Sequence, residues 1–246
     1  MKRLMLAAAL AFGAAGQALA ADLPQPPPPQ APTAYVPTVA PVYNWGGIYW
    51  GLNGGYGFGS SEWTDPSNAS VSSSTGDFDV KGFLGGGTLG LNFQSDVWVF
   101  GIEGDFDGSW LNGTSSSAFC GAVNLGAAAQ CQTKNTWLGT VRGRVGYAAD
   151  RVLFYGTAGG AFGNIEAGVN GLQNSTEFGW TAGAGIEFAV ADNWTARVEY
   201  LFVDLGNATC NNLNTCGNDA LGGPAANQTV KFDANLIRVG VDYLFR

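Results

Sequence analysis

The chain of 246 residues contains no histidine. That absence removes the Ser-His-Asp arrangement, histidine-based metal sites and the usual general base near neutral pH. Carboxylate pairs such as Glu103 with Asp105 could carry acid–base chemistry, but they equally suit a polar interior. No GxGxxG or GK[ST] motif follows a strand and opens a helix, so no phosphate loop is predicted. We therefore expect no enzyme, no catalytic residue, no metal site and no cofactor.

Long apolar runs are missing after residue 20. No stretch beyond that point approaches the 18 consecutive apolar residues that a membrane-spanning helix needs. Charge is also scarce, because only 12% of residues are charged, about half the usual share. A soluble surface would carry far more lysine and glutamate. The acidic balance, 19 acidic against 11 basic residues, disfavours nucleic acid as a partner. If this chain enters a membrane, it does so with strands.

The N-terminus has the anatomy of a secretory signal peptide over residues 1–20. Lys2 and Arg3 precede a short apolar run over 4–15 and the small-residue site Ala18-Leu19-Ala20. Cleavage after Ala20 removes two positive charges and takes the net charge from −8 to −10. An N-terminal membrane helix is the alternative, and it is disfavoured because two glycines interrupt the run.

Residues 21–44 form a proline-rich segment that contains eight of the ten prolines. Proline cannot donate to a strand ladder and favours extended polyproline II, which predicts a periplasmic linker. Binding of peptidoglycan or of a partner domain is the alternative role.

The remainder, residues 45–246, predicts an all-β domain. Eight segments alternate with period two, over about 47–59, 78–93, 97–110, 134–148, 152–168, 176–190, 194–205 and 231–245. Three connectors are short, around 94–96, 149–151 and 191–193, and four are long, over about 60–77, 111–133, 169–175 and 206–230. This parity predicts an eight-stranded antiparallel up-and-down transmembrane β-barrel with both termini on the short-turn side.

Aromatic pairs ten residues apart share one strand face in four of these segments. At a tilt near 40°, ten residues rise about 25 Å, the height of the apolar band of an outer-membrane barrel. One member of each pair falls beside a short turn and the other beside a long loop, as expected for two interfacial girdles. The pairs are Phe83 and Phe93, Phe100 and Trp110, Trp137 and Tyr147, and Phe178 and Phe188.

The opposite face of the strands carries a compact, nearly balanced set of charges. An eight-stranded barrel has an interior just wide enough for side chains, and isolated charges there are costly, so these groups are expected to pair. The resulting charged network would plug the lumen; a charge-selective channel or a gate is the alternative. Its members are Glu103, Asp105, Arg142, Arg144, Glu187, Arg197, Glu199, Arg238 and Asp242.

The four cysteines form two local pairs in a chain expected to be exported, where oxidation is favoured. We predict the disulfides Cys120–Cys131 and Cys210–Cys216, which close short loops. Two other connectivities are formally open. Metal ligation is disfavoured because neither pair has CxxC spacing.

Three segments together resemble the porin-like outer-membrane immunogenic proteins of Gram-negative bacteria. They are the signal peptide with its Ala-Asp-Leu-Pro continuation, the stretch 45–57 (WGGIYWGLNGGYG), and the closing 238–246 (RVGVDYLFR). The resemblance covers about residues 45–246, and the chain is similar, more distantly, to the barrel of outer-membrane protein A. It implies an outer-membrane location and a role in envelope integrity and surface interaction, often antigenic, with no catalytic residues. A small porin is the alternative function.

The resemblance also bears on partners. The expected ones are outer-membrane lipid and lipopolysaccharide, the barrel insertion machinery, and a host or environmental ligand at the external loops, with the barrel itself a monomer. Barrel proteins commonly end in an aromatic residue that the insertion machinery reads, whereas this chain ends in Arg246. We therefore assign the insertion signal to Tyr243 and Phe245.

Overall fold

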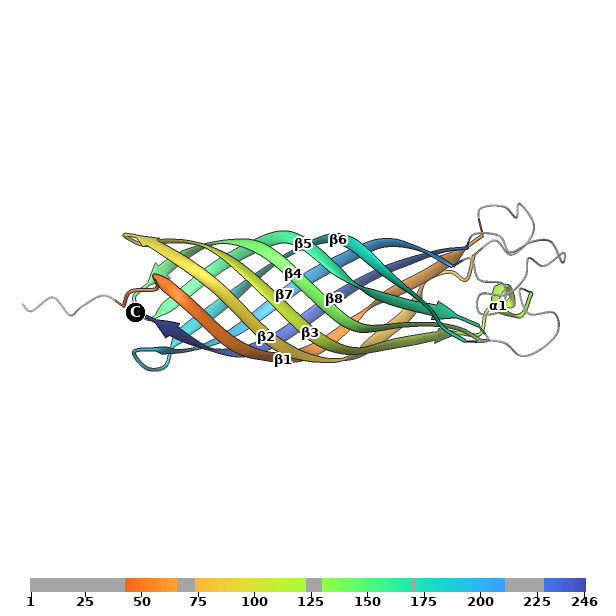
Figure 1. Cartoon of the computed structure of the whole chain (residues 1–246), viewed down its shortest axis with the longest axis horizontal. Coiled ribbons are helices and arrows are strands. Elements are labelled where there is room, and N and C mark those ends of the chain that lie inside the picture. Colours follow the sequence, from red (N-terminus) through yellow and green to blue (C-terminus); the bar gives the residue numbers. More distant parts are fainter. Residues whose placement is uncertain (1–42, 66–73, 123–129, 170, 211–227) are drawn as a thin grey trace, which may run out of the picture. The chain divides into compact units, whose positions relative to one another are not determined.

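A computed structural model describes residues 43–65, 74–122, 130–169, 171–210 and 228–246 (Figure 1). Within these ranges, eight antiparallel strands form a closed barrel in sequence order, and β8 pairs with β1 to complete it. This confirms the predicted fold. The elements are β1 (Gly47–Thr64), β2 (Phe78–Ser95), β3 (Trp98–Ser115), α1 (Ala118–Ala122), β4 (Cys131–Ala149), β5 (Val152–Gly168), β6 (Gln173–Ala189), β7 (Trp194–Cys210) and β8 (Gln228–Phe245).

The predicted signal peptide (1–20) and the linker up to residue 42 lie outside the described residues. In the part of the chain that is described, no helix is long and apolar enough to cross a membrane.

The three short turns, the start of β1 and the end of β8 lie together at one end of the barrel, which we call the turn end (Figure 1). The opposite end is the loop end. Asp96 and Asp150 have a φ of 53° in the β2–β3 and β4–β5 turns. Aspartate tolerates this left-handed conformation better than most residues. The three short turns lie where the sequence predicted them, but the β5–β6 connector, expected to be long over 169–175, spans only 169–172.

The aromatic pairs lie on the outside of the barrel in two girdles. On the loop side, the rings of Phe106, Trp137, Phe162 and Phe178 follow one another with centroids 5.6, 6.2 and 6.4 Å apart. On the turn side, the Tyr243 ring lies 5.1 Å from Trp194 and 4.9 Å from Phe245. Exposed aliphatic side chains such as Val239 fill the band between the girdles. This pattern is that of a surface in contact with lipid.

Several strands are longer than the sequence predicted, and most of the extra length lies at the loop end, whereas β5 has the predicted bounds. Segments expected over 97–110 and 194–205 are strands over Trp98–Ser115 and Trp194–Cys210. Strands of 17–19 residues correspond to a barrel wall roughly 45 Å high at a 40° tilt, against about 25 Å for an apolar band. The wall therefore continues roughly 20 Å beyond the loop-side girdle.

In this projecting segment of β8 the two faces of the strand exchange their character. In β8, Lys231 and Asp233 point outward while Val230 and Phe232 are buried; nearer the turn end, Val239 points outward and Arg238 is buried. The exchange follows the surroundings, because beyond the lipid the outside of the wall meets water.

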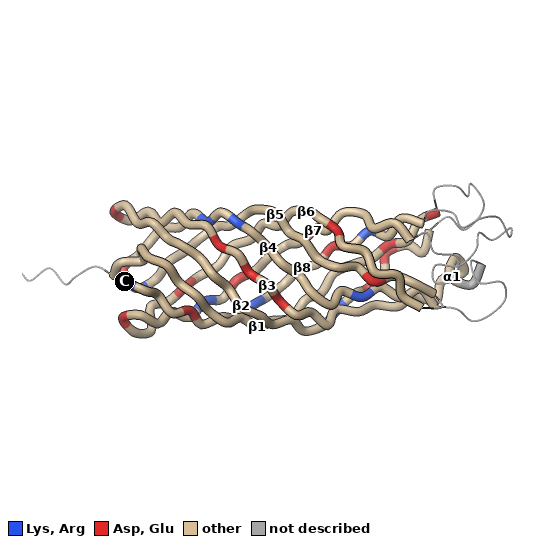
Figure 2. The backbone as a smooth tube through the Cα atoms, viewed as in Figure 1, with Lys and Arg blue, Asp and Glu red and all other residues tan. Residues whose placement is uncertain are grey.

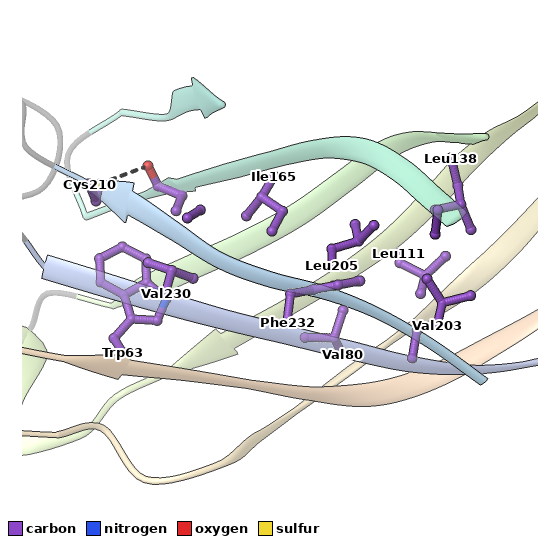
Figure 3. Close-up of a cluster of buried hydrophobic side chains, with 14 of the residues drawn as sticks. Trp63, Val80, Leu111, Leu138, Ile165, Val203, Leu205, Cys210, Val230 and Phe232 are labelled. Atoms are coloured by element: carbon purple, nitrogen blue, oxygen red, sulfur yellow. Dashed lines mark hydrogen bonds between the residues drawn. The ribbon is translucent and has the colours of Figure 1, made fainter. Parts of the chain in front are cut away.

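The buried side chains of the projecting segment form the loop-side apolar cluster (Figure 3). Helix α1 contributes Phe119 and Cys120 to it. Its larger members are Trp63, Val80, Leu84, Leu111, Phe119, Leu138, Ile165, Leu201, Val203, Leu205, Val230, Phe232 and Leu236.

A smaller turn-side apolar cluster closes the other end of the lumen. Trp45, only 1% exposed, lies at its centre with Tyr43 beside it. The indole Nε1 of Trp45 donates to the carbonyl of Asp150 at 3.0 Å, and the Tyr43 hydroxyl donates to the carbonyl of Asp192 at 3.0 Å. The residues immediately before β1 are therefore tied to two turns.

The lipid-facing assignment predicts a position-dependent cost of charge on β8. We expect Val239→Lys, at mid-band, to lower the free energy of unfolding by about 2–4 kcal/mol, because the ammonium would face hydrocarbon. The control Thr229→Lys lies on the same face ten residues away, beyond the girdle, and should cost about 0–1 kcal/mol. Urea titration of protein folded into lipid vesicles measures both; equal losses would contradict the assignment.

Candidate functional site

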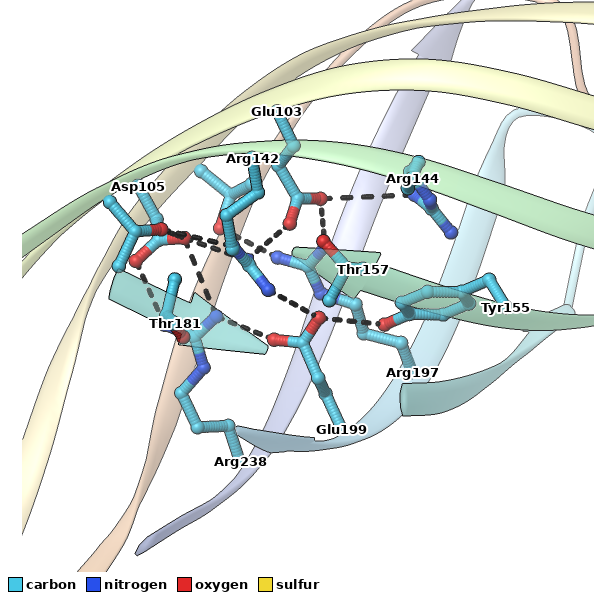
Figure 4. Close-up of polar contacts among 12 residues, drawn as sticks. Glu103, Asp105, Arg142, Arg144, Tyr155, Thr157, Thr181, Arg197, Glu199 and Arg238 are labelled. Carbon is cyan, nitrogen blue, oxygen red and sulfur yellow. Dashed lines mark hydrogen bonds and ion pairs between the residues drawn. The ribbon is translucent and has the colours of Figure 1, made fainter. Parts of the chain in front are cut away.

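A charged network occupies the lumen between the two apolar clusters (Figure 4). Every one of its charged side chains is nearly excluded from solvent, with 0–4% of its surface exposed. All nine residues that the sequence singled out lie in it, and Asp107 is a tenth.

Strand register brings several of the opposite charges face to face. Glu103 of β3 pairs with Arg142 of β4, and Glu199 of β7 pairs with Arg238 of β8. Because directly opposed side chains on one face of an antiparallel pair lie about 5 Å apart, such neighbours can form ion pairs without displacing the backbone.

Further ion pairs cross the lumen and join strands that are not neighbours. Arg142 of β4 contacts Glu103, lies 2.7 Å from Asp105 on β3, and reaches Glu199 on β7 at 3.0 Å. Arg238 of β8 lies 2.5 Å from Glu199 and 3.0 Å from Asp105. The two guanidinium groups therefore tie β3 and β4 to β7 and β8 across the interior.

Glu103 accepts hydrogen bonds from side chains on three other strands. Besides Arg142, it accepts a bond of 2.6 Å from Arg197 and another of 2.6 Å from the Tyr49 hydroxyl. Charge-assisted bonds of this kind are shorter and stronger than neutral ones. Glu103 thus links β1, β3, β4 and β7.

Arg144 and Arg197 extend the network toward the turn end. Arg144 lies 2.7 Å from Glu187 of β6, and its guanidinium lies over the Tyr155 ring at 4.0 Å from the centroid. Arg197 Nε lies 3.4 Å from Asp242. Charged or aromatic members of the network therefore come from every strand of the barrel except β2.

Asp107 lies 2.7 Å from Arg238. Its place two residues after Asp105 on one strand face already suits the polar interior by sequence. The sequence did not identify Tyr49 and Thr140 as partners; the Thr140 hydroxyl donates to Asp105 at 2.7 Å. Nothing local marks a tyrosine or threonine as a lumen residue beyond alternation.

The network holds four guanidinium groups and six carboxyl groups. Each arginine contacts at least one carboxylate within 3.0 Å, so the cations are engaged by fixed partners. Chemically, this arrangement favours a rigid strut over a site that receives and releases a substrate.

The predicted disulfide Cys120–Cys131 is present, with the two Cα atoms 5.5 Å apart, and it joins α1 to the start of β4. The predicted partner of Cys210 is Cys216, which lies outside the described residues. Phe245 is 50% exposed at the end of β8, and Tyr243 contacts both Phe245 and Trp194.

Comparison with known proteins gives a consistent set of relatives. Residues 5–245 match the family model of the outer membrane protein beta-barrel domain. The chain is 37% identical over 263 residues to the 31 kDa outer-membrane immunogenic protein of Brucella melitensis, covering 100% of both chains. It is 34% identical over 248 residues to the 25 kDa outer-membrane immunogenic protein of Brucella abortus, covering 100% of this chain and 99% of that one.

Solved structures resemble the fold at lower similarity. The outer membrane protease OmpT from Escherichia coli has a TM-score of 0.49 at 9% identity, covering 81% of this chain and 97% of that chain. The N-terminal beta-barrel domain of Pseudomonas aeruginosa OprF has a TM-score of 0.36 at 12% identity, covering 80% and 97%.

Removing one arginine should expose the dependence of the barrel on the charged network. Arg238→Leu leaves Asp105, Asp107 and Glu199 without a cation they share, and we expect a loss of about 3–5 kcal/mol in unfolding free energy. As a control, Arg151→Gln removes an exposed arginine 4.0 Å from Asp192 and should cost about 1 kcal/mol or less. Urea titration in vesicles compares them; similar losses would contradict a structural network.

Proposed function

The chain belongs to the outer-membrane protein β-barrel domain family, together with the outer-membrane immunogenic proteins, and from this we propose that it is a non-conducting structural barrel of the outer membrane. In this proposal it supports the envelope and holds its loops at the cell surface. No catalytic step is part of it.

The observation that carries the proposal is the filling of the lumen at three successive levels. Trp45 and Leu153 lie within the turn-side cluster, Arg142 lies in the charged network, and Leu236 and Phe232 lie in the loop-side cluster, each 2% exposed or less. An eight-stranded barrel is narrow enough for side chains to fill it.

The charged network supports this function over that of a small porin. An ion crossing this level would have to separate guanidinium and carboxylate groups that bond across the lumen, such as Arg142 with Glu199. It would also have to cross two layers of buried, mostly apolar side chains.

The orientation we propose places the turn end, with the start of β1, the end of β8 and the three short turns, in the periplasm. The loop end then lies outside the cell. Outer-membrane barrels typically combine short periplasmic turns with longer external loops. The polar outer face of the projecting wall, which includes Lys231 and Asp233, suits a water-facing position beyond the outer leaflet. Surface ligands would then be met at the loops and at this wall.

A planar-bilayer recording tests the non-conducting function. We expect purified protein that shows the gel shift of a folded barrel on heating to give no current steps of reproducible size, because the lumen is filled. Insertion is checked by floating the same protein with the vesicles used for fusion. Discrete, reproducible steps from folded protein would contradict the proposal and favour the small porin.

The C-terminal strand supplies the proposed insertion signal, Tyr243 and Phe245. We expect deletion of residues 243–246 to lower the amount of folded, heat-modifiable barrel in the outer membrane severalfold, because both aromatic residues of the signal are lost. Deletion of Arg246 alone, which leaves Phe245 terminal, is the control and should leave assembly intact. Unchanged assembly after the longer deletion would refute the assignment.

A further inference from the structure

A hollow of about 300 Å³ lies on the barrel surface where β3, β4 and β5 leave the loop-side girdle. Unlike the lipid-facing surface below it, this hollow is lined by six polar residues together with Leu111 and the exposed indole of Trp110. The residues that matter here are Trp110, Asn112, Lys134, Asn135, Thr136 and Glu166.

Irregular pairing in the sheet forms the hollow. The β3–β4 register shifts between Gly108 and Leu111, and the β4–β5 register shifts between Lys134 and Leu138. Bulges of this kind bend a strand and redirect its side chains, and they are common at barrel rims and beside functional sites.

Buried Asn164 holds the bulge of β4 in place. Its side-chain oxygen accepts bonds from the backbone nitrogens of Thr136 and Trp137 at 2.9 and 3.0 Å. Its side-chain nitrogen donates to the Thr136 hydroxyl at 2.7 Å and to Glu166 at 3.3 Å. Because Asn164 is only 1% exposed, the rim of the hollow is fixed before any ligand arrives.

A row of polar side chains crosses the hollow at one level of the wall. Register places Lys81 beside Asn112, Asn112 beside Lys134, and Lys134 beside Glu166. Strands are spaced by about 4.8 Å, so the backbones at Lys81 and Lys134 lie about 10 Å apart. Neither lysine forms an ion pair with any residue that the structure describes. Figure 2 shows both basic and acidic residues on the strands toward this end of the barrel, as well as in its middle.

The position of this row is that of lipid headgroups. Trp110, 67% exposed, lies two residues from Asn112 on the same face, and Phe83 lies two residues from Lys81. Exposed aromatics mark the edge of the hydrocarbon, and lysines just beyond it attract anionic headgroups.

The side chains fit a sugar that carries negative charge. An exposed indole offers a flat apolar surface, Asn112 and Glu166 can bond to hydroxyl or amide groups, and the two free ammonium groups can hold an anionic substituent. We propose that this hollow, with Lys81 at its edge, binds the anionic sugar headgroup of an outer-leaflet glycolipid such as lipid A. The inference rests on the proposed orientation, which places this wall at the outer leaflet.

Lys231, on β8, provides a matched control outside the hollow. It also points outward beyond the girdle, but its cross-strand neighbours are Glu62 and Asn207, and it does not line the hollow. A general attraction between lysine and anionic lipid would involve Lys231 as much as Lys81 and Lys134.

Native mass spectrometry of the purified barrel in detergent, titrated with diphosphorylated lipid A, tests the site. We expect one retained lipid, and a roughly tenfold to thirtyfold weaker affinity for Lys81→Gln/Lys134→Gln, from about one headgroup contact per lysine. Lys231→Gln should bind as the unmodified protein does. Lipid A without its phosphates should bind weakly to all three.

Two further arms decide the sugar component and separate this inference from the proposed function. Trp110→Leu should weaken lipid A binding severalfold and leave binding of phosphatidylglycerol, an anionic lipid without the sugar, unchanged. Equal loss for both lipids, or equal affinity of the double lysine variant and the unmodified protein, would overturn the site. Either result leaves the proposed non-conducting function untouched, because that function is tested separately by the heat-modifiability gel and the bilayer recording of the same samples.

Discussion

The closure of eight strands into a narrow barrel determines most of what is found inside it. In lipid every backbone group must be bonded within the chain, and the pairing of β8 with β1 leaves no open edge there. The enclosed space is narrow enough for side chains to fill it. Charges that point inward must then satisfy one another, as Arg142 does with Glu103, Asp105 and Glu199. The charged network and the filled lumen are two results of the same constraint.

The part of the chain that contacts lipid could be predicted from the sequence, because its signals are local. Period-two alternation places Val239 and Arg238 on opposite faces of the strand. Because an arginine that faces lipid is costly, the face that carries Arg238 could be identified as the inward one. The turns at Asp96 and Asp150 stand where alternation stops. Aromatic spacing then gave the height of the band.

The projecting wall and the ion-pair partners could not be predicted in the same way. Beyond the girdle, the alternation with period two continues, and Val230 and Phe232 point inward. Because water replaces lipid outside, the outward residues there are polar, and the prediction therefore ended the strand too early. Partners such as Arg142 and Glu199 are 57 residues apart, and their meeting depends on the register of the whole barrel. The bulge held by Asn164 has no local signature either, since asparagine is common in loops.

The height of the wall separates two demands on this protein. Strand pairing persists to Cys210 with Gln228 and to Thr64 with Thr229, so the roots of the loops are fixed well beyond the lipid-facing band and the charged network. A loop can therefore change in length or sequence without altering any residue that the membrane or the strut depends on. In the proposed orientation, selection at the cell surface and selection for assembly thus act on different residues, which leaves the loop end free to diversify.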